Sequence, residues 1–390
     1  MNDKAAPIIM RPAGGRAWRK WWLKIHLYLG LFIGALLLVF GTTGAMLVFW
    51  IEIDEWLNPE LRTVIAPALD KAAFQPLHKI MRAAEQVAAP NSKFTTVYGS
   101  LSREGVFAVY ASQPSGNWQR IFVNPYLAQA TGVRNYRVNE WIPDYLMDAI
   151  FSLHYALLMG ENGIILAAIC ALFLIISLIT GLIVWWPANG QWSKAFTIKR
   201  NASRVRLNFD LHKTFSLYFF PVLGAVLLSG VYMNLNDPFI WMTQHFSATT
   251  RGSPQLLESF PIPGIPPMDV ERAWSLATKH YPEGEFNSIS LPETITGVYV
   301  ISQRNVPRLS SYWSERLITI DQYSGKILDV RAPNARRSAG ETFLDWQWPL
   351  HTGKAFGWFG RILVLLCGLA CSVIYITGVI RWLQKRGVQK

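Results

Sequence analysis

The chain has 390 residues, of which 51% are hydrophobic and only 16% are charged, and its formal net charge is +12 at pH 7. The apolar residues gather into long uncharged runs, which is typical of a membrane protein and excludes an ordinary soluble domain. The positive charge lies next to these runs, so it reflects membrane topology and does not indicate nucleic-acid binding.

Four runs are long enough to cross a membrane. A helix needs about 20 apolar residues to span the roughly 30 Å hydrocarbon core of a bilayer. The four runs without a charged side chain are Leu27–Trp50, Gly163–Trp186, Thr214–Asn236 and Ile362–Ile380. The first run is too long for a signal peptide, so we interpret it as a retained membrane anchor.

Basic residues beside the runs predict the orientation of the chain. Segments 1–26, 187–211 and 381–390 together carry fifteen basic and two acidic residues, which predicts that all three are cytoplasmic. The predicted organisation is a cytoplasmic segment 1–26, a first span 27–50, an external domain 51–153, an interfacial segment with the second span 154–186, a connector 187–211, a third span 212–236, a second external domain 237–350, an interfacial segment with the fourth span 351–380, and a tail 381–390.

Each external domain is predicted to be a helix packed on a small antiparallel sheet. The helical stretches are Pro76–Ala89 in the first domain and Asp269–His280 in the second. Runs rich in β-branched and aromatic residues follow each helix, with turn residues between them. These predicted strands are Val106–Ala111, Arg120–Val123, Gly297–Ser302 and Arg316–Ile320.

The two halves of the chain resemble each other, which indicates a tandem duplication. The second half matches the first without gaps in three consecutive blocks, at offsets of 186, 192 and 197 residues. Both repeats begin on the same side of the membrane, so we expect parallel repeats related by a pseudo-two-fold axis along the membrane normal. The predicted fold class is a membrane α+β protein, with a four-helix bundle in which Gly30, Gly34, Gly41 and Gly44 permit close approach of a helix or a flat ligand.

Seven histidines occur, and the duplication pairs four of them. His26 matches His212 at the predicted cytoplasmic face, and His154 matches His351 at the outer face. A single histidine at a membrane boundary is usually an interfacial side chain, but two that are related by a two-fold axis can approach one flat ligand from opposite sides. The other three match non-histidine residues and are interpreted as surface or interfacial side chains; they are His78, His245 and His280.

Two imidazoles without further ligands favour haem over zinc. A zinc site needs three or four protein ligands, whereas haem iron takes two axial ligands when all six positions are filled. The sequence lacks the C-x-x-C-H motif of covalent attachment, so a haem would be b-type. We therefore expect two bis-histidine haems, one between His26 and His212 and one between His154 and His351. The cysteines Cys170, Cys367 and Cys371 all lie in predicted helices, which excludes a disulfide framework.

Several motifs resemble the PepSY-associated transmembrane family. They are Lys24-Ile-His26-Leu-Tyr-Leu-Gly30-Leu, Asp210-Leu-His212-Lys, the Ile-Thr-Gly-x-Ile-x-Trp endings at 179–185 and 376–382, and Ile320-Asp-Gln-Tyr-Ser-Gly325. The resemblance covers nearly the whole chain. Members related to iron uptake include ferrisiderophore reductases of the FoxB type in the bacterial inner membrane. The resemblance implies two haem b groups with His26, His212, His154 and His351 as axial ligands, and reduction of a ferric siderophore in the periplasm.

Such a reaction is physically reasonable. Ferric iron in a siderophore is held by hard oxygen donors, and one-electron reduction weakens that grip. It needs no acid, base or nucleophile, so no catalytic side chain is assigned. A docking surface is expected to include external aromatic residues, namely Trp141, Tyr312, Trp313, Trp346 and Trp348.

Two rival interpretations remain open at this point. Parallel repeats are common in transporters, although the spans carry ionisable residues only at their edges, at Lys213 and Arg361. A PepSY-containing regulatory or binding protein without haem is the second rival. The sequence lacks the G-x-G-x-x-G and P-loop motifs of nucleotide sites, so the electron donor is expected to be a quinol or a separate cytoplasmic reductase.

Overall fold

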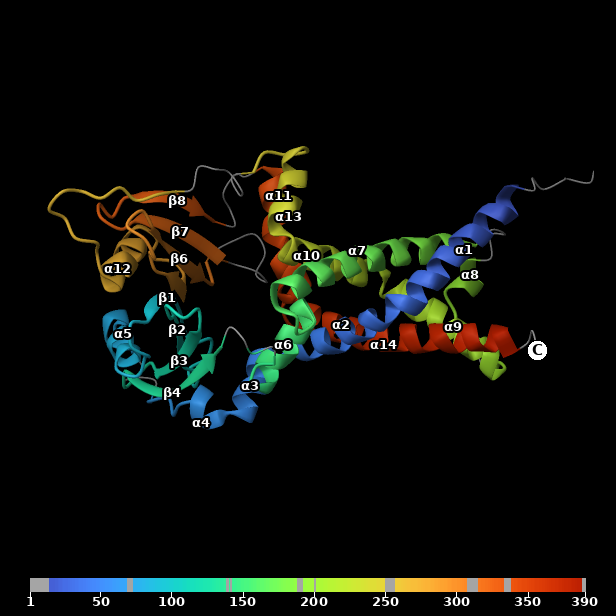
Figure 1. The fold of residues 1–390 in the computed structure, drawn as a ribbon, viewed down its shortest axis with the longest axis horizontal. Coiled ribbons are helices and arrows are strands. Elements are labelled where there is room, and N and C mark those ends of the chain that lie inside the picture. The colour runs from blue at the N-terminus through green and yellow to red at the C-terminus, as the bar shows by residue number, and fades with distance from the viewer. Residues whose placement is uncertain are drawn as a thin grey trace, which may run out of the picture.

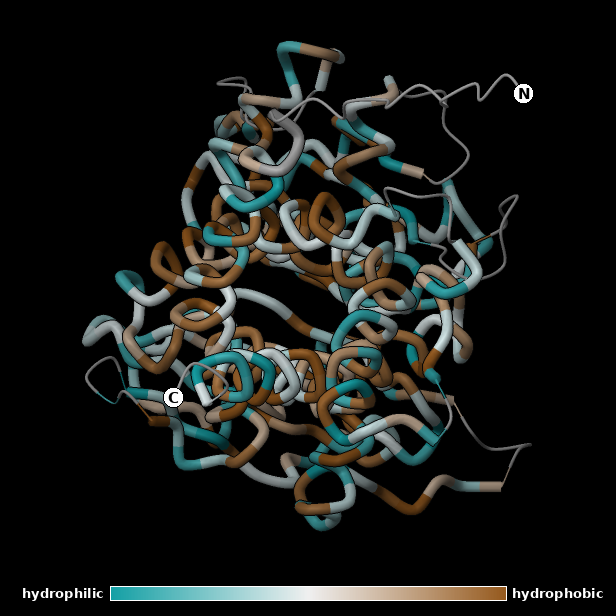
Figure 2. Tube along the Cα trace, turned by 90° about the vertical axis from the view of Figure 1, so that its right-hand side faces the viewer, coloured by the Kyte–Doolittle hydropathy of each residue, from teal (hydrophilic) through white to brown (hydrophobic). Residues whose placement is uncertain are grey.

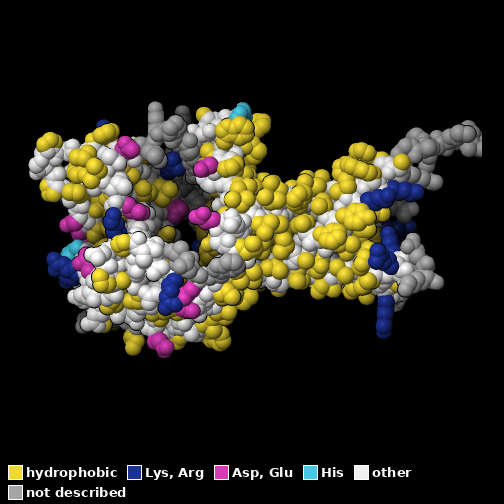
Figure 3. All heavy atoms as spheres, viewed as in Figure 1, with side chains coloured by type: hydrophobic (Ala, Val, Ile, Leu, Met, Phe, Trp, Pro, Cys, Tyr) yellow, Lys and Arg dark blue, Asp and Glu magenta, His cyan; other side chains and the backbone are white. Residues whose placement is uncertain are grey.

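The computed structural model describes residues 14–68, 73–137, 140, 142–187, 192–199, 201–249, 257–306, 315–332 and 338–387. A bundle of long helices extends from a domain that contains one large β-sheet (Figure 1). Hydrophobic side chains cover the face of the bundle seen in Figure 3, and the Lys and Arg side chains gather at its end away from the sheet. The mixture of apolar helices and antiparallel sheet that the sequence predicts is confirmed.

Two helices of the bundle are long and apolar enough to cross a membrane by themselves. One is α7 (Gly160–Trp185), and the other is the stretch Lys354–Gly387, which contains α14 (Gly357–Gly387). Two further candidate spans are each a bent pair of helices. The pairs are α1 (Gly14–Phe32) with α2 (Gly34–Leu47), and α9 (Arg204–Tyr218) with α10 (Phe220–Asn234). Figure 2 views the molecule along the bundle and shows hydrophobic residues in many of its helical turns.

The bends have local causes in the sequence. The α9–α10 pair bends by 60° just before Pro221, which has no backbone N–H and whose ring collides with the preceding helical turn. The α1–α2 pair bends by 55° at Ile33, where Gly30 and Gly34 flank the break. The predicted first and third spans therefore each correspond to a bent pair of helices.

The bends let each bent pair pack on two different helices. The first half α1 packs on α7, whereas α2 packs on α14. In the same way α9 packs on α14, whereas α10 packs on α7. Helices α7 and α14 therefore each pack on the first helix of one bent pair and on the second helix of the other.

Gly41 sets the close approach of α2 and α14. A Cβ atom at this position would lie 2.4 Å from Cys371 Cβ and 2.7 Å from the Gly368 carbonyl oxygen. A Cβ atom added at Gly30, in contrast, would have no neighbour within 4 Å. The four glycines expected to permit close approach therefore differ, because Gly41 contacts a helix, Gly34 contacts Tyr375 and Gly44 contacts a histidine ring.

We expect Gly41→Ala to lower the thermal unfolding midpoint of the protein in detergent, because the added methyl group forces the two helices apart. Overpacking of this kind costs about 1–3 kcal/mol. Gly30→Ala is the matched control and should leave the midpoint unchanged or raise it, since alanine favours the helix and meets no neighbour. Equal losses for both variants would contradict the close-contact explanation.

One eight-stranded antiparallel sheet lies at the other end of the molecule. Its strand order is β4-β3-β2-β1-β5-β6-β7-β8. The strands are β1 (Lys93–Tyr98), β2 (Phe107–Ser112), β3 (Trp118–Asn124), β4 (Gln129–Tyr136), β5 (Glu285–Ser290), β6 (Val298–Arg304), β7 (Glu315–Asp321) and β8 (Ile327–Arg331). The sequence predicts two separate small sheets, and the structure corrects this, because β1 and β5 pair and join them.

The join is centred on Val97 and Ile289. These residues pair with each other and lie 192 positions apart, which is the offset found in this part of the sequence. Thr96 pairs with Ser290 and Tyr98 with Ser288, so the pairing is symmetric about the central pair. Both central side chains are fully buried.

Two helices cover one face of the sheet and enclose its core. They are α5 (Leu77–Glu85) and α12 (Val270–His280), which also contact each other. Apolar side chains from the helices and from both halves of the sheet form one continuous cluster, which includes Ile80, Val109, Ile121, Ala273, Ile301 and Ile318. Because one cluster spans both halves, the two predicted domains share a single core. We refer to the sheet with α5 and α12 as the sheet domain.

Short helices connect the sheet domain with the bundle. On the side of the first half these are α3 (Trp50–Leu57), α4 (Pro59–Arg62) and α6 (Leu146–Ala156). On the other side lie α11 (Asn236–Gln244), α13 (Ala339–His351) and the 3-10 turn η2 (Lys354–Phe356). Helix α8 (Trp192–Ala195) belongs to the connector at the opposite end of the bundle.

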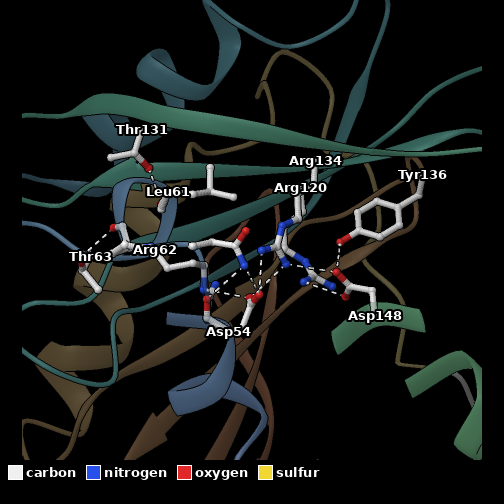
Figure 4. A network of polar contacts seen from close by, with 11 residues as sticks. Asp54, Leu61, Arg62, Thr63, Arg120, Thr131, Arg134, Tyr136 and Asp148 are labelled. Carbon is white, nitrogen blue, oxygen red and sulfur yellow. Dashed lines mark hydrogen bonds and ion pairs between the residues drawn. The ribbon is translucent and has the colours of Figure 1, made fainter. Parts of the chain in front are cut away.

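A buried ion network fastens α3 and α6 to the sheet (Figure 4). Arg134 on β4 is completely buried, and its guanidinium group contacts Asp54 of α3 at 2.7 Å and Asp148 of α6 at 3.1 Å. Arg120 on β3 reaches the other oxygen of Asp148 at 3.2 Å. The Tyr136 hydroxyl donates to Asp148 at 2.9 Å, and burial raises the pKa of this hydroxyl, so it stays protonated. The network therefore fixes where both helices enter the bundle.

Candidate functional site in the helical bundle

The structure brings His26 and His212 together. They lie on α1 and α9, and their ring centroids are 6.3 Å apart with the ring planes at 67°. Nδ1 of His26 lies 2.9 Å from the Ser177 carbonyl oxygen on α7. Nδ1 of His212 lies 2.8 Å from the Ile374 carbonyl oxygen on α14. Each ring is therefore hydrogen-bonded to the long helix next to it, His26 to α7 and His212 to α14.

His154 and His351 form a second pair with nearly the same geometry. They lie on α6 and α13 at the sheet-domain end of the bundle, with ring centroids 6.0 Å apart and planes at 68°. Nδ1 of His154 lies 3.0 Å from the Thr43 hydroxyl oxygen on α2. Nδ1 of His351 lies 3.0 Å from the Ser229 hydroxyl oxygen and 3.1 Å from the Val226 carbonyl oxygen, both on α10.

These contacts determine which nitrogen of each ring carries the proton. A carbonyl oxygen only accepts hydrogen bonds, so Nδ1 must donate to it. The Thr43 hydroxyl donates its own proton to the Val39 carbonyl at 2.6 Å, so it also accepts from the ring. All four rings therefore carry the proton on Nδ1, and Nε2 keeps a lone pair that can bind a metal ion.

A hydroxyl residue followed by glycine supports each ring. These supporting pairs are Thr43–Gly44, Thr180–Gly181, Ser229–Gly230 and Thr377–Gly378. Cε1 of the ring lies 2.9 to 3.5 Å from the place that a Cβ atom of the glycine would occupy. The hydroxyl orients the ring and the glycine makes room for it. The sequence repeat contains these pairs at matching positions, but the sequence alone does not connect them with the histidines.

The spacing of the rings fits one metal ion per pair. An imidazole nitrogen binds a metal ion at about 2 Å and lies about 1.1 Å from its ring centre, so two imidazoles on one ion have centroids about 6.2 Å apart. The observed separations of 6.3 and 6.0 Å agree with this value. In the described part of the chain, groups of three or more His, Cys, Asp or Glu that could hold a metal ion are absent. The donor set therefore fits haem, whose porphyrin supplies the other four ligands.

The remaining histidines lie singly. His245 and His280 each hydrogen-bond through Nδ1 to a carbonyl oxygen of their own helix at 2.9 Å. His78 lies 3.5 Å from Glu271 between α5 and α12, outside the bundle. The structure thus brings together the four histidines that the repeat pairs and leaves the other three apart.

The structure describes two of the five aromatic residues that were expected to form a docking surface. Trp346 and Trp348 lie on α13, the helix that carries His351, and the side chain of Trp348 is 46% exposed. Trp141, Tyr312 and Trp313 lie outside the described residues. The three cysteines are buried and free of disulfide bonds.

Comparison with models of protein families identifies a match. The family model described as the PepSY-associated TM region matches residues 23–385, which is nearly the whole chain. A search of curated proteins finds no match.

Proposed function

Because the chain belongs to the family of proteins with a PepSY-associated TM region, we propose that it is a di-haem b electron-transfer protein of the bacterial inner membrane that reduces ferric siderophores. In this proposal the chain consists of two parallel tandem repeats with four spans. The basic end of the bundle, with both termini, faces the cytoplasm, and the sheet domain lies in the periplasm. The enzyme class is a haem-dependent ferric-siderophore reductase of the FoxB type.

The two facing histidine pairs carry the proposal. His26 and His212 hold one haem near the cytoplasmic face, and His154 and His351 hold the other near the periplasmic face. When bound, each haem supplies a reversible one-electron iron couple. The chain orients the four imidazoles through the supporting hydroxyl groups and keeps water away with the apolar helices around them.

The substrate chemistry suits this arrangement. A siderophore holds Fe³⁺ through hard oxygen donors, and the Fe²⁺ formed by adding one electron is held less tightly by the same donors. Iron is then released without bond cleavage in the chelator. The periplasmic histidine pair lies beneath the sheet domain, so the surface around α13 and the sheet is the proposed docking region for the chelate.

The first test is a visible spectrum of the purified protein, reduced with dithionite minus oxidised by air. We expect sharp b-type bands that correspond to two haems per chain. Addition of ferric hydroxamate, catecholate or citrate chelates to the reduced protein without oxygen should reoxidise the haems with at least one of the three.

Two outcomes would count against the proposal. Protein that purifies colourless from haem-sufficient cells would contradict haem binding. Protein that binds haem but stays reduced with all three chelates would contradict ferric-chelate reduction and favour a different electron acceptor.

A further inference from the structure

The connector between α7 and α9 forms a cavity at the end of the bundle that carries the basic residues. It folds back along α9 and leaves a cavity of about 410 Å³ that is largely open to the outside. The lining residues are Phe196, Thr197 and Ile198 of the connector and Thr214 and Tyr218 of α9. This volume falls within the range of about 300–1,000 Å³ that is usual for small-molecule sites.

Polar contacts fasten the connector over α9. Lys213 donates to the carbonyl oxygens of Lys194 and Thr197 at 3.0 Å each, and to the buried carboxylate of Asp210 at 3.1 Å. The Tyr218 hydroxyl donates to the Phe196 carbonyl oxygen at 2.7 Å. These hydrogen bonds are made to backbone carbonyl oxygens of the connector. The apolar side chains of Phe196 and Ile198 line the cavity.

One polar group of the cavity lining has no hydrogen-bond partner among the described residues. Thr214 is 4% exposed, and its hydroxyl oxygen is buried without a hydrogen-bond partner among the described residues. A helical threonine usually donates to the carbonyl oxygen one turn earlier, as Thr43 does here. A buried unpaired hydroxyl is unfavourable, so its presence at a cavity wall points to a ligand that supplies the partner.

The cavity lies at the basic end of the bundle, which the proposed function places at the cytoplasmic membrane surface, and it is one helix away from a histidine pair. Tryptophan rings, which favour the membrane–water boundary, surround the connector, with Trp185 5.4 Å from the Phe196 ring. Residues two apart on a helix point to nearly opposite sides, so Thr214 and His212 are separated by the width of α9, about 10 Å. The exposed side chains of Tyr218 and Phe196 leave the cavity open at the outside of the bundle.

We propose that this cavity binds the headgroup of a membrane quinol, which donates the electrons; this proposal rests on the proposed function. The Thr214 hydroxyl donates to an oxygen of the quinol headgroup, the ring packs on Phe196 and Ile198, and the isoprenoid tail leaves along Tyr218 into the lipid. Oxidation of the quinol to the quinone releases two electrons and two protons. The electrons reduce two ferric ions to two ferrous ions on the far side, one at a time, and the protons pass to water at the cytoplasmic face.

The first repeat provides a control, because its matching positions face outward. The residues that match Thr214 and Tyr218 are Tyr28 and Phe32, whose side chains are 60% and 74% exposed. Tyr28 lies two residues after His26, as Thr214 lies two residues after His212. A substitution at Tyr28 therefore tests the same helix position at an exposed site.

The test measures haem reduction by decylubiquinol and by menadiol in the purified protein. We expect Thr214→Leu, which fills the cavity, to slow quinol-driven reduction at least tenfold. Thr214→Val, which only removes the hydroxyl, should raise the KM for quinol several-fold with little change in thermal stability. Haem content, dithionite reduction and reoxidation by ferric chelate should remain those of the wild type in both variants, and Tyr28→Leu should behave as wild type throughout.

A second measurement does not depend on haem. A photoreactive azidoquinone should label a peptide within residues 192–218, and excess decylubiquinone should compete with the labelling. Labelling elsewhere, or quinol rates unchanged in Thr214→Leu, would overturn the proposal, as would reduction that requires a soluble flavoprotein instead of quinol. A colourless protein would sink the haem assignment, whereas the azidoquinone result would still decide the cavity.

Discussion

Replacement of His154 with alanine is expected to remove one haem of two, and His351→Ala should remove the same one. Both rings bind the same iron in the proposed site, so losing either removes half of the axial ligation. His26→Ala and His212→Ala should each remove the other haem. The measurement is haem per chain by the pyridine haemochrome method, with spectra to identify which haem is lost.

Double variants distinguish pairing from general damage. His154→Ala with His351→Ala should lose no more haem than either single variant, because the two residues serve one site. His26→Ala with His154→Ala should lose both haems. The controls are His78→Ala, His245→Ala and His280→Ala, which should keep two haems per chain. Haem loss in these controls, with the four paired histidines dispensable, would refute the assignment.

Arg134→Met is expected to cause the largest loss of stability in the sheet domain. Its guanidinium group is fully buried and bridges the carboxylates of Asp54 and Asp148, so its removal takes away their shared partner and leaves Asp54 only Arg62 and Asp148 only Arg120 as ion-pair partners. Breaking a buried ion pair in this way costs about 3–5 kcal/mol. Thermal unfolding in detergent, followed by tryptophan fluorescence, is the measurement.

The matched control for this variant is Arg331→Met. Arg331 is the counterpart of Arg134 in the second repeat, and its ion pair with Asp329 is partly exposed to solvent. Exposed pairs contribute about 0–1 kcal/mol, so the loss should be small. Adding Asp54→Asn and Asp148→Asn to Arg134→Met should lower the stability further, because Arg62 and Arg120 then lose their carboxylate partners. Recovery of stability in the triple variant would contradict this account of the network.

The sequence predicts which histidines lie together but not the residues that support their rings. The pairing of His26 with His212 and of His154 with His351 follows from the repeat alone, and the structure brings both pairs together. In the sequence, the hydroxyl–glycine pairs beside the histidines can be recognised only as residues that recur in both halves. Their function depends on which helix lies next to each ring, and the bent, exchanged packing of the helices decides that.

The sheet and the ion network were less predictable for physical reasons. Strands β1 and β5 pair through backbone groups that every strand possesses, so side-chain patterns do not reveal that two edges 192 residues apart will meet. The position that matches Asp54 in the second repeat is Ile240, so the full network exists only in the first half. Matching the two halves of the sequence predicts the features that they share, but not a feature such as this network that one half alone contains.

The exchanged packing of the helices has a consequence for biosynthesis. Each histidine pair combines one ring from before residue 187 with one from after residue 211, and Nδ1 of His212 is held by α14 near Thr377. Neither pair is therefore complete until nearly the whole chain has left the ribosome and its last helix has entered the membrane. Under the proposed assignment, haem is inserted after translation, into a finished apoprotein.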